Sequence, residues 1–237
     1  MNTTRISVLS AALLALAACA PSNDPAAADA GAGNTAPTAD AADAADAADA
    51  AADAAPADAF LAALATHCGQ AFAGRIVANE PASPEPDAFE GHALVMHVRG
   101  CDDPTRQLLV PFHVGDDHSR TWVLTRTDAG LRLKHDHRHE DGSPDEQTMY
   151  GGDTSTAGTA VRQEFPVDQE SIELFGRTGA DVSTTNTWAM EIEPGQRFLY
   201  ELARPEGGLN PQGRMFQVEF DLTTPVDLPP APWGSTD

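Results

Sequence analysis

The sequence predicts an all-β fold, an up-and-down antiparallel lipocalin-like barrel of about 8–10 strands with a short N-terminal helix. Short segments alternate apolar and polar side chains with the period of two that a half-buried strand requires. Turn-forming Gly, Pro, Asn and Asp residues separate these segments. A β-sandwich fits the same signals and stays open as the alternative. The predicted strands are residues 71–78, 92–99, 107–114, 120–127, 131–140, 148–152, 160–165, 187–193, 197–203 and 215–222.

The alternation is clearest near the C-terminal end of the chain. In residues 216–222, Phe, Val, Phe and Leu alternate with Gln, Glu and Asp. One face of such a strand packs in the core and the other meets water. A membrane-spanning barrel would show outward apolar side chains and aromatic girdles, and aromatic residues are only 6% of this chain. A water-soluble type of barrel is therefore expected.

A short helix is expected to open the domain. Asp58 is positioned to cap it, residues 68–69 (Cys-Gly) to end it, and its apolar face comprises Phe60, Leu61 and Leu64. We expect the barrel domain to span residues 59–224.

A second short helix is expected at residues 169–175, with Ile172 and Phe175 facing inward, where it would cover one mouth of the barrel. Residues 225–237 are rich in Pro, so we expect them to run extended over the surface.

The first 18 residues have the features of a secretory signal peptide. Arg5 precedes an uncharged apolar run that is too short to span a bilayer. The run ends in Leu-Ala-Ala-Cys at residues 16–19, which resembles a lipobox, so we expect Cys19 to be acylated and to anchor the protein in a lipid bilayer. A small residue, Ala20, follows the cysteine and favours sorting to the outer membrane.

Residues 19–58 are predicted to form a solvated tether. Residues 20–58 hold 20 Ala and eight Asp and no Leu, Ile, Val or Phe that could be buried. As a flexible coil, this segment would have an end-to-end distance of about 35 Å. A partly helical tether is the alternative, because Ala is a strong helix former.

Two cysteines remain once Cys19 is assigned to the lipid. Cys68 and Cys101 form an even pair in an oxidising compartment, so we expect a disulfide between them. Their wide spacing makes a cysteine metal site a weaker interpretation.

The chain is strongly acidic. It has 14 Lys and Arg against 36 Asp and Glu, a net charge of -22 over 237 residues. This charge repels phosphate backbones and no basic stripe opposes it, so nucleic-acid binding is not expected.

The most informative predicted strand is residues 131–140, Leu-Arg-Leu-Lys-His-Asp-His-Arg-His-Glu. Its apolar face continues into His135, His137 and His139, while the charged residues share the opposite face. If the apolar face is the barrel interior, the three histidines line a mouth of the barrel.

The preceding hairpin can be aligned by the same alternation, since a shift of one residue would reverse every side chain. Pairing residue 124 with residue 133 sets Trp122 opposite His135, Arg120 opposite His137, and His118 opposite His139. A similar pairing after the next turn brings Tyr150 alongside. The predicted ligand-binding residues are Arg120, Trp122, His135, His137, His139 and Tyr150.

The histidines allow two kinds of site. His118, His135, His137 and His139 could supply ligands to a divalent transition metal such as zinc, copper or nickel. Arg120 in the same cluster argues instead for a small anionic ligand, because a cation beside a metal is unfavourable. Histidines on a strand are also often no more than polar rim residues, so a purely structural role stays open.

Several segments resemble a family of exported bacterial lipoproteins with no assigned activity. They are Pro-Phe-His-Val-Gly at 111–115, Arg-Thr-Trp-Val at 120–123, His-Asp-His-Arg-His-Glu-Asp-Gly-Ser-Pro-Asp at 135–145 and Met-Tyr-Gly-Gly at 149–152. The resemblance covers residues 60–233. It implies export and the domain boundaries given above, and it implies no function.

The functional expectation is an outer-membrane lipoprotein, facing the periplasm or the cell surface, whose barrel binds a small or anionic ligand. A protein-binding module, such as an inhibitor of a basic cell-wall hydrolase, is the first alternative. A metal-dependent enzyme is the second. The sequence has no nucleophile elbow and no phosphate-binding loop, so binding is favoured over catalysis.

Overall fold

The computed structural model describes residues 55–82 and 87–235. The predicted signal peptide (1–18), the cysteine predicted to be acylated (Cys19) and nearly all of the predicted tether (19–58) lie outside the described residues. The helices are α2 (Pro56–Ala65), α3 (Gln169–Thr178) and the short 3-10 helix η1 (Asp181–Thr185). The strands are β1 (Ala71–Glu80), β2 (Leu94–His97), β3 (Gln107–Val114), β4 (Asp117–Thr127), β5 (Gly130–His137), β6 (Tyr150–Asp153), β7 (Arg162–Pro166), β8 (Thr187–Glu193), β9 (Arg197–Arg204) and β10 (Arg214–Asp221).

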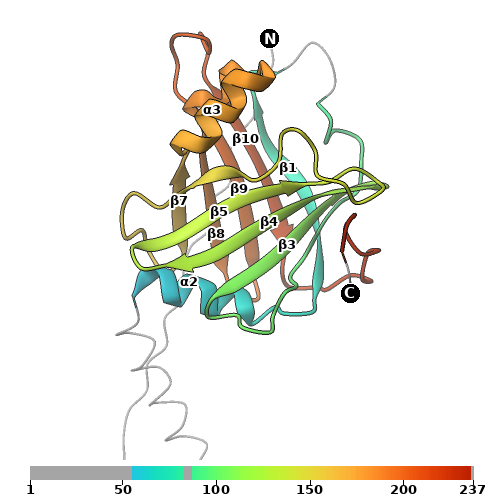
Figure 1. Cartoon of the computed structure of the whole chain (residues 1–237). Helices are drawn as coiled ribbons and strands as arrows, with labels where there is room; N and C mark the ends of the chain where they lie inside the picture. The colour runs from blue at the N-terminus through green and yellow to red at the C-terminus, as the bar shows by residue number, and fades with distance from the viewer. Residues whose placement is uncertain (1–54, 83–86, 236–237) are drawn as a thin grey trace, which may run out of the picture. The chain divides into compact units, whose positions relative to one another are not determined.

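The strands form one 10-stranded sheet in the order β6-β5-β4-β3-β2-β1-β10-β9-β8-β7. All of its strand pairs are antiparallel, and β10 returns to pair with β1. The sheet curls into a nearly closed barrel (Figure 1). The predicted up-and-down barrel is confirmed, and the single sheet replaces the sandwich alternative.

The barrel interior is the hydrophobic core. Alternate residues of the strands fill it, including Trp122, Trp188, Phe198 and Phe220, each at most 2% exposed. Predicted strands 107–114 and 187–193 match β3 and β8. Among the helices in the described part of the chain, none has the length and hydropathy to cross a bilayer.

The helix α2 differs from the prediction at both ends. Pro56 starts it, because the fixed φ of proline suits the first helical position, and its N-cap is Ala55. The predicted capping role of Asp58 is wrong, since its carboxylate instead accepts a hydrogen bond from the Arg126 guanidinium at 2.5 Å. The helix ends at Ala65, before the predicted Cys-Gly end.

The helix α3 was predicted correctly and extends a little further than expected. The side chain of Asp168 caps it by accepting from the Ser171 backbone N–H at 2.8 Å, and Gly179 ends it with a φ of 74°. Phe175 is buried and Ile172 half-buried. Figure 1 shows α3 at the end of the barrel opposite α2.

The predicted disulfide between Cys68 and Cys101 is present. It joins the chain after α2 to the loop after β2 and closes a sequence separation of 33 residues. In a chain-entropy treatment, a loop of this length stabilises the folded state by about 3 to 4 kcal/mol.

The C-terminal segment after β10 lies against the outside of the barrel. The Val226 N–H donates to the Ala71 carbonyl at 2.8 Å, and the Trp233 N–H donates to the His118 carbonyl at 3.0 Å. The described part of this segment therefore crosses from β1 to β4.

The barrel closes between β6 and β7 by close packing. Within the described residues, no ladder joins these two strands. A Cβ on Gly152 would lie 1.8 Å from the Pro166 carbonyl oxygen, so only glycine allows this approach. The Asp168 N–H donates to the Gly151 carbonyl at 2.9 Å, and the Gly151 N–H donates to the Ser171 hydroxyl at 2.8 Å.

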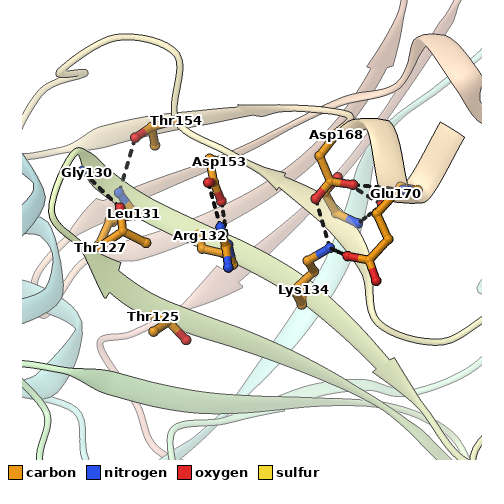
Figure 2. A network of polar contacts seen from close by, with 12 residues as sticks. Thr125, Thr127, Gly130, Leu131, Arg132, Lys134, Asp153, Thr154, Asp168 and Glu170 are labelled. Atoms are coloured by element: carbon orange, nitrogen blue, oxygen red, sulfur yellow. Dashed lines mark hydrogen bonds and ion pairs between the residues drawn. The ribbon is translucent and has the colours of Figure 1, made fainter.

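A buried lysine reinforces this closure. The Lys134 ammonium lies 2.8 Å from an Asp168 carboxylate oxygen and 3.2 Å from a Glu170 carboxylate oxygen (Figure 2). Its side chain is only 10% exposed, because the start of α3 covers it. Arg132 and Asp153 form a neighbouring ion pair that is about half exposed.

Replacing Lys134 tests the contribution of this contact. We expect Lys134→Met to lower the free energy of unfolding by about 1–3 kcal/mol, because it leaves the largely buried Asp168 carboxylate without its cation. Chemical denaturation measures the change. The control Arg132→Met removes an exposed pair and should cost less than about 1 kcal/mol. Equal losses in the two variants would contradict a special role for the buried lysine.

Candidate functional site

The predicted register of the hairpin β4–β5 is confirmed. Leu124 pairs with Leu133, which sets Trp122 opposite His135 and Arg120 opposite His137. These four residues of the site therefore lie on the inner face of the barrel. On the other side of β5, Tyr150 pairs with His135, so the predicted neighbour is also in place.

His118 lies on the other face of the sheet, so its predicted pairing with His139 is wrong. The register of β3 with β4 shifts between the pair Phe112–Arg120 and the pair Val114–Asp117. Two residues of β4 oppose His113 alone, and such a bulge reverses the alternation locally. The His118 ring turns outward, with its Nδ1 atom 2.7 Å from the Nδ1 atom of His113.

His139 also lies apart from the site. Strand β5 ends at His137, because the His139 N–H donates to the Ser143 carbonyl at 2.9 Å and closes a turn. The His139 side chain is 57% exposed, with Asp145 as its nearest carboxylate at 3.9 Å. The prediction of a strand to residue 140 is wrong for this reason.

The remaining predicted residues line a cavity of about 280 Å³ at the barrel mouth. Its lining comprises Arg120, Trp122, His135, His137 and Tyr150, together with Ala88, Phe89, Phe112, Thr121 and Tyr200.

One wall of the cavity is a row of nearly parallel rings. Successive centroids from Phe89 through Phe112 and Trp122 to Tyr200 lie 5.5, 5.0 and 4.4 Å apart. The corresponding interplanar angles are 10°, 23° and 21°. Such a wall favours a flat apolar group beside it.

Tyr200, Phe112 and Phe89 also line the cavity, although the sequence pattern does not place them there. Tyr200 carries the only hydroxyl on the inward face of the predicted strand 197–203, and a buried hydroxyl requires a partner. The need of this buried hydroxyl for a hydrogen-bond partner could have placed Tyr200 in a polar cluster. Phe89 lies in the loop between β1 and β2, where no period relates it to the other residues.

His135 is neutral and its tautomer follows from its two partners. Its Nδ1 atom lies 3.2 Å from the Tyr150 backbone carbonyl, which only accepts, so Nδ1 carries the proton. Its Nε2 atom then accepts from the Tyr200 hydroxyl at 2.9 Å. Burial, and next the neighbouring His137, lower the pKa of His135 to about 3.

His137 and Tyr150 form the second neutral pair. The Tyr150 hydroxyl lies 3.1 Å from the Nε2 atom of His137. Burial, and next the Arg120 charge, lower the pKa of His137 to about 4, while burial raises the pKa of Tyr150 to about 12. Both side chains are therefore uncharged at neutral pH.

Arg120 is the only described lining residue that carries a formal charge at neutral pH. Its Nη1 atom donates to an Asp117 carboxylate oxygen at 2.5 Å. The guanidinium carbon also lies 5.3 Å from the centroid of the Phe89 ring. The site is thus an aromatic pocket with one cation and two neutral hydrogen-bonded pairs.

The geometry does not gather the predicted metal ligands. In residues 55–82 and 87–235, no group of three or more His, Cys, Asp or Glu side chains is arranged to hold a metal ion. Both ring nitrogens of His135 already have hydrogen-bond partners, as does Nε2 of His137.

No protein-family model, curated protein or solved structure matched the chain in the comparisons. The function is therefore inferred from the pocket itself.

Protonation of the buried histidines predicts how stability depends on pH. The pKa values of His113, His135 and His137 are all lowered by burial, so between pH 6.5 and 4 the unfolded chain binds protons that the folded chain does not. Stability should fall as the pH falls, by at most about 1.4 kcal/mol per pH unit for each histidine. Denaturant unfolding at pH 4.5 and 6.5 measures the slope.

A matched pair of variants shows which histidine contributes to the slope of stability against pH. His137→Gln should flatten it, whereas His139→Gln, at an exposed position, should leave it unchanged. Carboxylates with lowered pKa values, such as Asp117 and Asp168, are present in both variants, so their contribution to the slope cancels in the comparison. An unchanged slope in His137→Gln would refute the neutral, buried state of this side chain.

Proposed function

We propose that the protein is an outer-membrane lipoprotein whose barrel binds a small organic ligand in the mouth pocket. The observation that carries this proposal is the cavity of about 280 Å³, with aromatic walls and a few convergent polar groups. Small-molecule sites combine these two features, and a dry cavity of about 150 Å³ is enough to hold benzene. The pocket therefore has room for a ligand of one or two rings.

Binding suits the site better than catalysis. A general base near neutral pH needs a pKa close to 7, and burial lowers the pKa of His137 to about 4. His135 has both ring nitrogens engaged by Tyr150 and Tyr200. These polar groups are suited to orienting a ligand.

The surface charge supports one alternative role. A net charge of -22 would speed encounter with a basic protein partner at low salt, as expected for an inhibitor of a basic cell-wall hydrolase. Such capture would weaken with salt and would not depend on pocket residues.

Ligand binding is tested by titrating the full-length protein, purified in detergent, with soluble one-ring molecules such as benzamide and phenol. Saturation-transfer NMR detects contact, and isothermal titration calorimetry gives the dissociation constant. We expect His137→Ala to weaken binding about tenfold, since it removes a lining contact and a hydrogen-bonding group. His139→Ala is the matched control outside the pocket and should bind normally. Similar binding in both variants would place the ligand elsewhere.

The membrane anchor is tested separately. Growth with labelled palmitate should label the wild-type protein and place it in the outer-membrane fraction of a density gradient. We expect Cys19→Ser to abolish both results, because it removes the acylated side chain. Cys68→Ser should keep the label, as a control for cysteine loss. Label retained in Cys19→Ser would refute the lipobox interpretation.

A further inference from the structure

We propose that the ligand of the mouth pocket is a planar aromatic monocarboxylate, whose carboxylate replaces that of Asp117 on the Arg120 guanidinium. The inference rests on the proposed function and names its ligand class. It also assigns a new role to Asp117, whose carboxylate competes with the ligand for the Arg120 guanidinium and so sets the affinity and selectivity of the pocket for that ligand.

The shape of the pocket selects a flat group. The row of nearly parallel rings ends in Trp122 and Tyr200. Trp122, His135 and Tyr150 are neighbours across β4, β5 and β6, and the rings of His135 and Tyr150 stack at 4.7 Å with an interplanar angle of 14°. An aromatic lining of this kind favours a planar ring, which can make stacked or edge-to-face contacts with it, over a bulky aliphatic group.

The polarity of the pocket changes with depth. The Arg120 side chain is 20% exposed, whereas Trp122, two residues further along β4, is 2% exposed. Alternate strand residues lie about 6.5 Å apart, so the cation is one step nearer to solvent than the indole. A ligand whose ring lies beside the buried indole and whose charged group lies beside the more exposed guanidinium matches this arrangement.

The charge at the mouth selects an anion. His135, His137 and Tyr150 are uncharged at neutral pH, which leaves Arg120 as the charged group of the described lining. A guanidinium has five donors in a planar fork that matches both oxygens of a carboxylate. Asp117 uses only the Nη1 donor among the hydrogen bonds described for this pair.

Asp117 is placed to give way to a ligand. Its side chain is 38% exposed, so its carboxylate can return to water at modest cost. One of its oxygens contacts Arg120, and the other accepts from the Ser119 backbone N–H at 2.9 Å. The second contact keeps Asp117 beside Arg120 when the first is broken.

Asp117 and a ligand carboxylate therefore compete for one guanidinium. Asp117→Asn removes the competing charge, and its side-chain oxygen can still accept from Ser119. This variant should bind an aromatic carboxylate more tightly than the wild type does. Arg120→Gln should do the opposite, because it removes the group for which both carboxylates compete.

The experiment compares benzoate with benzamide, its uncharged analogue of nearly the same shape, by calorimetric titration of the full-length protein in detergent at pH 7. We expect the wild type to prefer benzoate by about tenfold. Arg120→Gln should raise the dissociation constant for benzoate about tenfold and leave benzamide within about twofold. Asp117→Asn should lower the constant for benzoate about three- to tenfold, with no change for benzamide.

Each outcome decides a different point. If benzamide binds as well as benzoate, or Arg120→Gln leaves benzoate binding intact, the carboxylate proposal is overturned and the pocket remains a ligand site. If neither molecule shows binding that depends on His137, the proposed function fails and this inference fails with it. Thermal unfolding checks that Arg120→Gln is folded. If this variant does not fold, the benzoate affinity of Asp117→Asn still tests the proposal. A loss or no change of benzoate affinity in Asp117→Asn would overturn the competitor role.

Discussion

Closure of the barrel between β6 and β7 is the constraint on which the candidate site depends. A side chain on Gly152 of β6 would strike the Pro166 carbonyl of β7, and the Gly151 carbonyl accepts from the Asp168 N–H. The first turn of α3 then covers the seam through Asp168 and Ser171. Because Tyr150 is the first residue of β6, the same packing fixes its ring against His135. The barrel closure and the pocket wall are thus one structural unit.

Burial determines the electrostatics of this unit. Desolvation penalises the charged forms of imidazole and phenol, so histidines and tyrosines that enclose the pocket stay neutral and hydrogen-bond to one another. Neutral partners of this kind provide directional contacts without a desolvated charge. The formal charge of the described lining is confined to Arg120, which is less buried than Trp122 and His135. The lining at the mouth of this acidic protein therefore contains one cation, and Asp117 pairs with it.

Much of the fold and half of the site followed from alternation along the chain. The period of two gave the register of Trp122 with His135, because a shift of one residue would move Trp122 to the charged face. Tyr200 could not be placed in the same way, since it comes from β9 and meets β5 only through barrel closure. Phe89 reaches the pocket from a loop, where alternation carries no information. Local pattern predicts pairing between neighbouring strands, and contact across the barrel depends on the whole fold.

The bulge in β4 explains both the wrong placement of His118 and the charge pair at the mouth. Residues 117 and 120 are separated by an odd number of positions, so in a regular strand their side chains would lie on opposite faces. The extra residue in the bulge restores Asp117 to the inner face, opposite Val114, while Arg120 opposes Phe112. The same reversal turns His118 outward to His113. A single backbone irregularity thus removes a histidine from the pocket and supplies the carboxylate that a ligand would have to displace.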